Sequence, residues 1–181
     1  MQEKLVFFLD YANINRAAED KRFNLDYSHL LQYISESRFL IDAHCYVPID
    51  PRNEHRLDKE IEYLWRCGYV VNTKRGVVAG QSYKCDFDIE IAIDVLNTIY
   101  QIKPDIIVIA TGDVDFIPLI LQVRKLGVRV EAASFRDSAS SEIVLKSSGF
   151  IDLDLYYDDY LNSKQQEQKD SNLLHEKLTQ E

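Results

Sequence analysis

Residues 5–10 of the sequence read Leu-Val-Phe-Phe-Leu-Asp, and residues 106–115 read Ile-Ile-Val-Ile-Ala-Thr-Gly-Asp-Val-Asp. Continuous rather than alternating apolar runs indicate strands that are covered on both faces, and such strands are usually parallel. In open parallel sheets, the loops that leave the carboxyl ends of the strands form the ligand crevice. If the two strands are neighbours, Asp10, Asp113 and Asp115 meet in that crevice.

Carboxylates gathered in one crevice repel each other and raise each other's pKa unless a cation or a proton relieves them. Mg²⁺ or Mn²⁺ is the natural occupant, because oxygen-only ligands suit hard cations and leave positions for water and phosphate oxygens. The sequence therefore predicts a divalent metal site at this edge of the sheet.

Strand and helix patterns alternate outward from these two stretches. Further strands are expected at residues 39–47, 69–73, 128–133 and 150–153, and helices at 29–34, 52–67, 88–99, 116–126 and 138–148. Residues 11–15 are interpreted as a turn, and residues 74–82, with Gly76 and Gly80, as a loop that forms a substrate flap. This alternation is the pattern of a parallel α/β sandwich.

The length of 181 residues and the hydrophobic content of 46% suit one well-buried domain and are too small for two. We expect that domain at residues 1–160, followed by a polar tail at residues 161–181 that is helical or disordered. The three cysteines, Cys45, Cys67 and Cys85, show no C-x-x-C spacing. They are expected to be reduced thiols in the core or near the surface of a cytosolic protein.

No targeting or membrane segment is predicted. Residues 1–4 pass directly into the first strand and leave no room for a leader with a cleavage site. No apolar run approaches the roughly 20 residues of a membrane span. We therefore expect a cytoplasmic protein with no membrane partner.

The formal net charge of −9 argues against nucleic-acid binding through overall basicity. Local binding stays open, because the acidic site supplies several of these charges and bound metal would neutralise part of them. Basic side chains concentrate in the middle of the chain, where they equally fit solvated helix faces. They are Arg52, His55, Arg56, Lys59, Arg66, Lys74, Arg75 and Lys84.

A third source of carboxylate is the segment 84–88, Lys-Cys-Asp-Phe-Asp, at the start of the expected helix 88–99. Asp86 and Asp88 also suit a capping role, since the helix dipole favours an acid at the amino terminus. Packing of the apolar helix on the sheet aims Asp88 at the same sheet edge as the strand-end acids. Asp94 lies about 120° further around the helix and is assigned a supporting role or a bond to a backbone amide.

Four acids, Asp10, Asp88, Asp113 and Asp115, are thus candidates to surround one or two divalent ions. Hydrolysis of a phosphodiester is the reaction that such a site makes accessible, because a metal activates and orients water and stabilises the leaving oxygen. No side chain need become a covalent nucleophile.

Other polar residues near these acids have candidate roles. Asn13 is placed to hold a metal-bound water or a phosphate oxygen, and Thr111 to donate to an aspartate. An Asx turn and strand-end packing are the respective alternatives. Lys84, together with Lys74 and Arg75 of the expected flap, is assigned to substrate binding, and solvated side chains are the alternative.

Three motifs occur in a recognisable order: Leu-Asp-x-x-Asn at 9–13, a lysine at 84 followed by aspartates at 88 and 94, and Thr-Gly-Asp-x-Asp-Phe-x-Pro-Leu at 111–119. With them, about residues 4–155 resemble the NYN family, in the LabA-like branch of the PIN-like nuclease superfamily. The chain departs from the family at Thr111, where serine is frequent, and at residues 147–149, where an aspartate is common. One extra residue also separates Lys84 from Asp88.

The resemblance implies a PIN-like three-layer α/β/α sandwich with a mostly parallel central sheet. It also implies a Mg²⁺- or Mn²⁺-dependent ribonuclease with RNA as its substrate. The implied metal-binding acids are Asp10, Asp88, Asp113 and Asp115; Asn13 is the further catalytic residue, and Asp94 and Thr111 are in supporting positions.

Other functions are compatible with parts of this pattern. A PIN-like module that binds RNA as a regulator, with little or no turnover, is the main alternative. In a receiver-like or phosphatase-like domain Asp10 would accept phosphate, but Ala12 stands where such phosphatases place a second aspartate. A topoisomerase-primase type of site expects glutamate at the position of Asp10. Leucines in the tail allow a homodimer.

Overall fold

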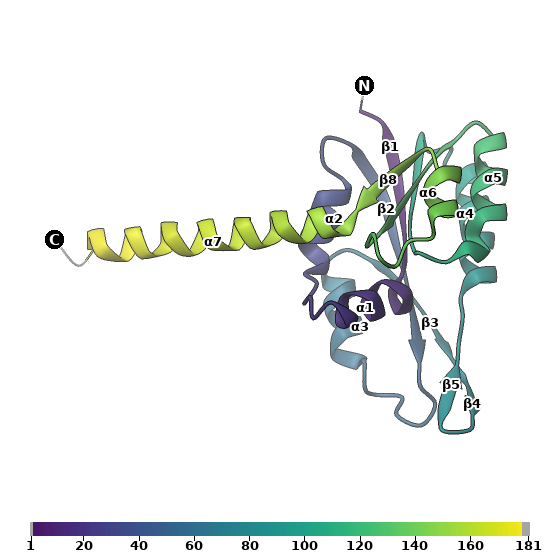
Figure 1. The fold of residues 1–181 in the computed structure, drawn as a ribbon, viewed down its shortest axis with the longest axis horizontal. Helices are drawn as coiled ribbons and strands as arrows, with labels where there is room; N and C mark the ends of the chain where they lie inside the picture. The colour runs from purple at the N-terminus through teal and green to yellow at the C-terminus, as the bar shows by residue number, and fades with distance from the viewer. Residues whose placement is uncertain (1, 179–181) are drawn as a thin grey trace.

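A six-stranded sheet lies at the centre of the computed structural model, which describes residues 2–178, with side chains through Lys169 (Figure 1). Every neighbouring pair of its strands is parallel. In sheet order the strands are β3 (Val70–Arg75), β2 (Phe39–Ile49), β1 (Lys4–Asp10), β6 (Ile106–Ala110), β7 (Arg129–Ser134) and β8 (Gly149–Asp152).

Helices cover both faces of this sheet, which confirms the predicted three-layer α/β/α fold. One face packs against α1 (Tyr11–Asp20), α2 (Tyr27–Ile34), α3 (Asp58–Arg66) and the start of α7 (Leu153–Leu178). The other face packs against α4 (Asp88–Gln101), α5 (Ile117–Lys125) and α6 (Ser141–Lys146), with the short 3₁₀ turn η1 (Val114–Phe116) before α5.

Strand β1 explains why the first apolar run decides the fold. Its residues 5–9 are fully buried. Leu5, Phe7 and Leu9 belong to the core on one face, whereas Val6 and Phe8 belong to the core on the other. Burying each such side chain contributes roughly 1.5–3 kcal/mol, so a strand that is apolar on both faces is stable only in the middle layer.

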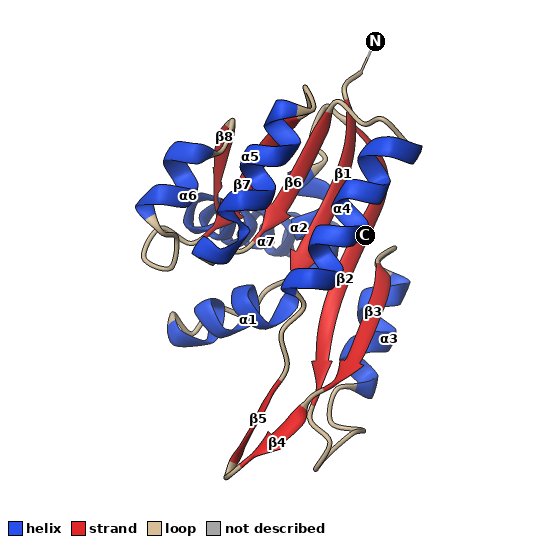
Figure 2. Ribbon diagram, turned by 90° about the vertical axis from the view of Figure 1, so that its right-hand side faces the viewer, coloured by secondary structure: helices blue, strands red, loops and turns tan. Residues whose placement is uncertain are grey.

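Strands β1 and β6 are direct neighbours (Figure 2), and Leu9 lies opposite Ala110 in their parallel ladder. Their carboxyl ends therefore lie at the same edge of the sheet. The connections that leave β1 run over one face, and the connection that leaves β6 runs over the other. The gap between β1 and β6 is thus the topological switch point, where open parallel sheets bind their ligands.

The turn predicted at residues 11–15 is wrong, because helix α1 begins directly after β1. Asp10 caps this helix by accepting a hydrogen bond from the Asn13 backbone N–H. Tyr11, Ile14 and Ala18 bury its inner face. A helix formed here because tertiary burial and the Asp10 cap outweigh the turn preference of the two asparagines.

The loop predicted at residues 74–82 is also wrong. Strand β3 continues to Arg75, and β4 (Val77–Ala79) and β5 (Ser82–Lys84) then form an antiparallel hairpin. The hairpin extends away from the sheet at its carboxyl edge (Figures 1 and 2). The Arg52 guanidinium donates to the backbone oxygen of Gln81, which ties the hairpin to the segment after β2.

Several other elements differ from the prediction in their bounds. Helix α3 begins at Asp58 rather than residue 52, because residues 52–57 form turns. Helix α6 is shorter than predicted, since Ser140 caps its start and the helix ends at Lys146. Helix α7 begins at Leu153 and runs without interruption past residue 160. It projects from the domain (Figure 1), and residues 179–181 of the predicted tail lie outside the described range.

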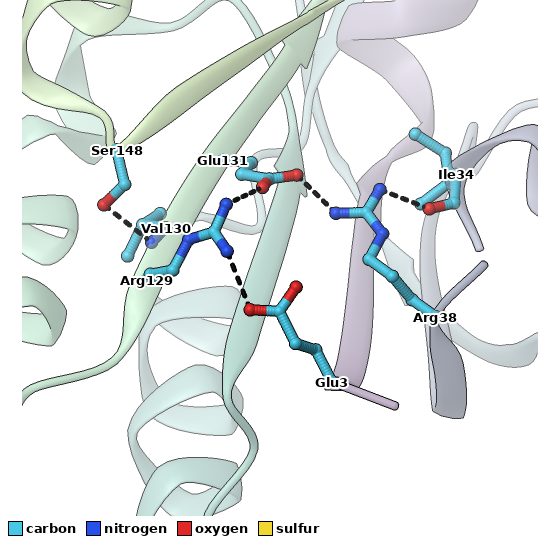
Figure 3. A network of polar contacts seen from close by, with 7 residues as sticks. All are labelled: Glu3, Ile34, Arg38, Arg129, Val130, Glu131 and Ser148. Atoms are coloured by element: carbon cyan, nitrogen blue, oxygen red, sulfur yellow. Dashed lines mark hydrogen bonds and ion pairs between the residues drawn. The ribbon is translucent and has the colours of Figure 1, made fainter. Parts of the chain in front are cut away.

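The opposite, amino-terminal edge of the sheet is held by a network of charged side chains (Figure 3). The Glu131 side chain, which is 10% exposed, accepts from Arg38 at 2.6 Å and from Arg129 at 3.0 Å. Arg129 also pairs with Glu3 at 2.8 Å. These contacts connect β7 with the segments that precede β1 and β2, at the far end of the strands from the acidic residues.

Candidate metal centre

Asp10 lies at the carboxyl end of β1 and is largely buried. Its Oδ1 accepts from the Asn13 backbone N–H at 3.3 Å, and its Oδ2 accepts from the Thr111 hydroxyl at 3.4 Å. Burial raises the pKa of Asp10 from 3.8 to about 6, and the nearby carboxylates of Asp88 and Asp113 act in the same direction. This carboxylate is therefore destabilised as an anion unless a cation lies beside it.

The segment 111–115 after β6 brings two more acids to the same edge. Asp113 caps η1 by accepting from the Asp115 backbone N–H at 3.0 Å. The Asp113 backbone N–H in turn donates to the Thr111 hydroxyl at 3.2 Å. Thr111 thereby joins Asp10 on β1 to the turn that carries Asp113.

Gly112 fits this turn because it has no side chain. A Cβ at this position would overlap the backbone carbonyl of Ser138, so the backbone of the loop after β7 approaches more closely than any other residue type allows. The Gly112 backbone N–H donates to the side-chain oxygen of Asn13 at 2.9 Å. The Asx turn considered for Asn13 is therefore wrong, since its side chain bridges α1 and the segment after β6.

Asp88 reaches the edge from the first turn of α4. Phe87 is the N-cap of this helix, so neither Asp86 nor Asp88 caps it, although Asp88 lies in the first turn, where the helix dipole favours an acid. Burial and the carboxylates of Asp113, Asp86 and Asp115 raise the pKa of Asp88. One carboxylate oxygen each of Asp88, Asp113 and Asp115 lies within 4.8 Å of the others.

These acids face a cleft of about 160 Å³ at the switch point of the sheet. Asp10, Asp88 and Asp113 all line this cleft, which brings together carboxylates from β1, α4 and the segment after β6. Asp115 is the most exposed of the four acids, at the rim of the cluster. The other residues that line the cleft are Ala12, Asn13, Arg16, Cys85, Asp86 and Phe87.

Arg16 is a cleft residue that the sequence interpretation did not identify. It lies one helical turn after Asn13 on α1, and its side chain makes none of the ion pairs found within residues 2–169. A helix that starts at residue 11 would have placed Arg16 on the same face as Asn13. Because residues 11–15 were interpreted as a turn, the sequence did not place Arg16 beside Asn13.

The three basic residues assigned to substrate binding do not line this cleft. Lys74 pairs with Glu90 at 2.6 Å, and Arg75 pairs with Glu54. Lys84 is exposed on the hairpin strand β5. Of the wider basic group, Arg52, His55 and Arg66 also have acidic partners.

Asp94 does not line the acidic cleft either. Its Oδ2 accepts from the Tyr46 hydroxyl at 2.7 Å, so the partner is a side chain on β2 rather than a backbone amide. Both residues line a separate cleft between α4 and the ends of β2 and β3. The three cysteines are free thiols, and only Cys45 is fully buried.

The donor set of the acidic cleft fits a hard divalent cation. It offers carboxylate oxygens from three segments, without a histidine or cysteine among the clustered ligands. The raised pKa of Asp10 and of Asp88 shows that these negative charges are unfavourable as they stand, and a cation would relieve them. Oxygen-only ligands with room for further ligands are what Mg²⁺ and Mn²⁺ require.

Fold and site together define a class of protein: a doubly wound α/β domain with a carboxylate cluster at the carboxyl edge of its sheet. The chain belongs to the NYN domain family, whose model matches residues 4–154. NYN domains are part of the PIN-like nuclease superfamily, are generally nucleases and typically depend on divalent metal ions.

Individual proteins are also similar to this chain. An uncharacterized protein of Methanocaldococcus jannaschii is 25% identical over 129 residues, which are 71% of this chain and 46% of that protein. The chain thus spans about half the length of this curated relative. A protein of unknown function from Vibrio parahaemolyticus shares the fold, with a TM-score of 0.72 and 20% identity over 86% of this chain and 96% of the other.

Within the described residues, no helix is both long enough and apolar enough to cross a bilayer.

Proposed function

We propose that the chain is a Mg²⁺- or Mn²⁺-dependent ribonuclease of the LabA-like branch, which hydrolyses phosphodiester bonds of RNA. The observation that carries this proposal is the approach of Asp88, Asp113 and Asp115 to within 4.8 Å in a domain of the NYN family. Asp88 of this cluster also lines the cleft, and burial and the neighbouring carboxylates raise its pKa, which makes it a candidate functional residue.

Each acid has a distinct task in this proposal. Asp88, Asp113 and Asp115 hold the metal, and Asp10 completes the negative wall of the cleft from β1. When bound, the metal supplies charge that orients water and stabilises the leaving oxygen of the phosphodiester. Asn13 and Thr111 act by fixing the carboxylates, because they hydrogen-bond Gly112 and Asp10.

Arg16 gives the cleft its only cationic lining residue within the described side chains, and we assign it to the RNA phosphate. A guanidinium binds phosphate in two-point geometry, which suits it to hold the scissile group against the acids. The hairpin β4–β5 flanks the same sheet edge and exposes Lys84 and Val77, so we assign it to the RNA strand. RNA is present in the cytoplasm, and we propose that the protein acts there.

Cleavage of labelled single-stranded and structured RNA tests this proposal. The wild-type chain, Asp113→Asn and the control Asp20→Asn are each incubated with Mn²⁺, Mg²⁺ or chelator. Asp20 is exposed near the far end of α1, so its variant controls for the loss of one charge. We expect metal-dependent cleavage by the wild type and the control, and none by Asp113→Asn. Equal cleavage by Asp113→Asn or in chelator contradicts the mechanism, and RNA binding without cleavage identifies a regulatory module.

A further inference from the structure

A second cleft lies beside the acidic one, at the same edge of the sheet. Its volume is about 410 Å³, and Phe87 lines both clefts. Its other lining residues come from β2, β3 and α4: Tyr46, Asn72, Thr73, Lys74, Glu90, Ile93 and Asp94. Neither the family match nor the carboxylate cluster gives this second cleft a role.

Backbone geometry explains why these side chains converge. In the parallel ladder Tyr46 lies opposite Asn72, so both side chains point to the α4 side of the sheet. On α4, Glu90 is one turn before Ile93 and Asp94, which places the three on one helix face. The cleft is therefore formed by regular elements and not by a chance arrangement of loops.

Two residues that line this cleft each have one buried polar atom without a hydrogen-bond partner within the described part of the chain. These atoms are the amide nitrogen of Asn72 and one carboxylate oxygen of Glu90. The other Glu90 oxygen accepts from Lys74 at 2.6 Å. Buried donors and acceptors are normally satisfied, so an unpaired donor and an unpaired acceptor on two residues that line one cleft favour a ligand that supplies both complements.

We propose that this cleft binds a guanine base of the RNA, next to the phosphodiester that the acidic cleft receives; this inference rests on the proposed ribonuclease function. Guanine offers two adjacent donors, N1–H and the N2 amino group, and next to them the acceptor O6. In this arrangement the Glu90 carboxylate accepts both donors, one at the unpaired Oε2 and one at Oε1, which it shares with Lys74, and the Asn72 amide donates to O6. Adenine lacks two adjacent donors on its Watson–Crick edge. Pyrimidines have only one ring and therefore cover less of the cleft.

The apolar part of the cleft suits the ring of a base. Tyr46 and Phe87 both line it, with ring centroids 5.5 Å apart. Ile93 is 52% exposed although it lines the cleft, which leaves an apolar surface for the base to cover. Apolar walls with a few convergent polar groups are typical of small-ligand sites in proteins.

The distance between the two clefts matches neighbouring parts of one nucleotide chain. Asp10 lies opposite Tyr46, and Tyr46 lies opposite Asn72, so Asp10 and Asn72 are at the same level of the sheet. Two strand spacings separate them, roughly 10 Å. A base in the second cleft thus leaves its adjoining phosphate within reach of the acids.

Binding of guanosine monophosphate in chelator tests the pocket without any cleavage step. Inosine, adenosine and uridine monophosphates serve as comparisons in calorimetric titrations of the full chain. We expect guanosine monophosphate to bind best, and inosine monophosphate, which lacks the N2 amino group, to bind about tenfold more weakly. Equal affinity for all four nucleotides, or no binding of guanosine monophosphate, overturns the inference.

Variants of the two polar residues separate recognition from folding. Asn72→Asp keeps the size of the side chain but replaces the donor by an acceptor, and Glu90→Gln replaces an acceptor by a donor. Each variant is expected to bind guanosine monophosphate about tenfold or more weakly than the wild type. Each should still unfold cooperatively, which shows that it is folded. Glu62→Gln, at an exposed ion pair on α3, is the control and should bind like the wild type. Unchanged binding by both pocket variants contradicts the assignment.

The same variants separate this inference from the proposed function. Cleavage in Mn²⁺ after every base, with no preference for guanine, overturns the guanine pocket and leaves the ribonuclease intact. Guanosine monophosphate binding by a chain that cleaves no RNA overturns the ribonuclease and leaves a guanine nucleotide site. Preferred cleavage next to guanine, lost in Asn72→Asp, supports both.

Discussion

The side-chain oxygen of Asn13 on α1 accepts the backbone N–H of Gly112 after β6 at 2.9 Å. This bond joins the two segments that follow the central strands β1 and β6. Asp10 and Asp113 lie within three residues of its two ends, so their separation depends on it. The bond therefore helps the pairing of β1 with β6 to hold the two sides of the acidic cleft together.

Asn13→Ala should loosen this connection. The variant leaves the partly buried Gly112 N–H without its partner, which costs about 1–3 kcal/mol in the free energy of unfolding. We expect weaker Mn²⁺ binding as well, because the carboxylates lose their fixed separation. Chemical denaturation and Mn²⁺ titration measure the two effects. Asn97→Ala, at an exposed position of α4, is the control; if both variants behave alike, the bond to Gly112 has no special role.

Gly112→Ala should be more disruptive than other glycine substitutions. Its new Cβ would overlap the Ser138 carbonyl, and a shift of this backbone costs about 1–3 kcal/mol. Gly149→Ala is the matched control, because a Cβ there meets side-chain atoms of Glu131 at an ordinary 3.4 Å. Thermal unfolding in chelator compares the two. Equal stabilities would mean that the loop at Ser138 moves aside freely.

The stability of the metal-free chain should depend on pH through Asp10. Its pKa is about 6 in the folded state against 3.8 ordinarily, so the unfolded chain loses this proton first as pH rises. Protonated Asp10 therefore contributes to the free energy of unfolding below pH 4, and this contribution is lost as the pH rises through 6. Asp10→Asn has no such proton, and its amide oxygen still caps α1. We expect it to gain about 2–3 kcal/mol over the wild type between pH 4 and pH 7.5.

Denaturation curves in chelator across this pH range measure that gain. Mn²⁺ should raise the free energy of unfolding of the wild type at pH 7.5, since the cation offsets the repulsion between carboxylates. Its effect on the stability of Asp10→Asn should be smaller. A stability difference that is the same at pH 4 and pH 7.5 contradicts the raised pKa of Asp10.

The charged network at the opposite edge of the sheet should affect stability alone. Glu131→Gln leaves Arg38, which is 18% exposed, without its charge partner and should cost about 2 kcal/mol (Figure 3). Glu3→Gln removes a 51% exposed partner of Arg129 and should cost less than about 0.5 kcal/mol. Neither variant should change Mn²⁺ affinity. A loss of Mn²⁺ binding in Glu131→Gln would show that the two edges are coupled.

The sequence predicted the central part of this fold because the information there is local. The apolar runs before Asp10 and Asp113 identify buried parallel strands, and the rule for strand ends then brings their acids together. The structure agrees, since β1 and β6 are neighbours. The hairpin β4–β5 was missed because its strands are three residues each and contain no alternating pattern long enough to recognise.

The surroundings of the acids depended on tertiary contacts that no local pattern contains. Asp94 is held by Tyr46, whose position depends on how β2 passes under α4. Lys74 and Arg75 have acidic partners that lie 16 and 21 residues away in the sequence. Arg16 was not identified because helix α1 was not predicted. This helix forms because its inner face is buried against β1 and β2. Sequence periodicity alone does not report such partners.

Calorimetric titration of Mn²⁺ into the full chain at pH 7.5 is the most direct test of the proposed metal centre. We predict saturable binding by the wild type and by Asp20→Asn, and its loss in Asp113→Asn, which removes one carboxylate of the cluster with Asp88 and Asp115. No uptake by the wild type, or equal uptake by Asp113→Asn, would contradict the account.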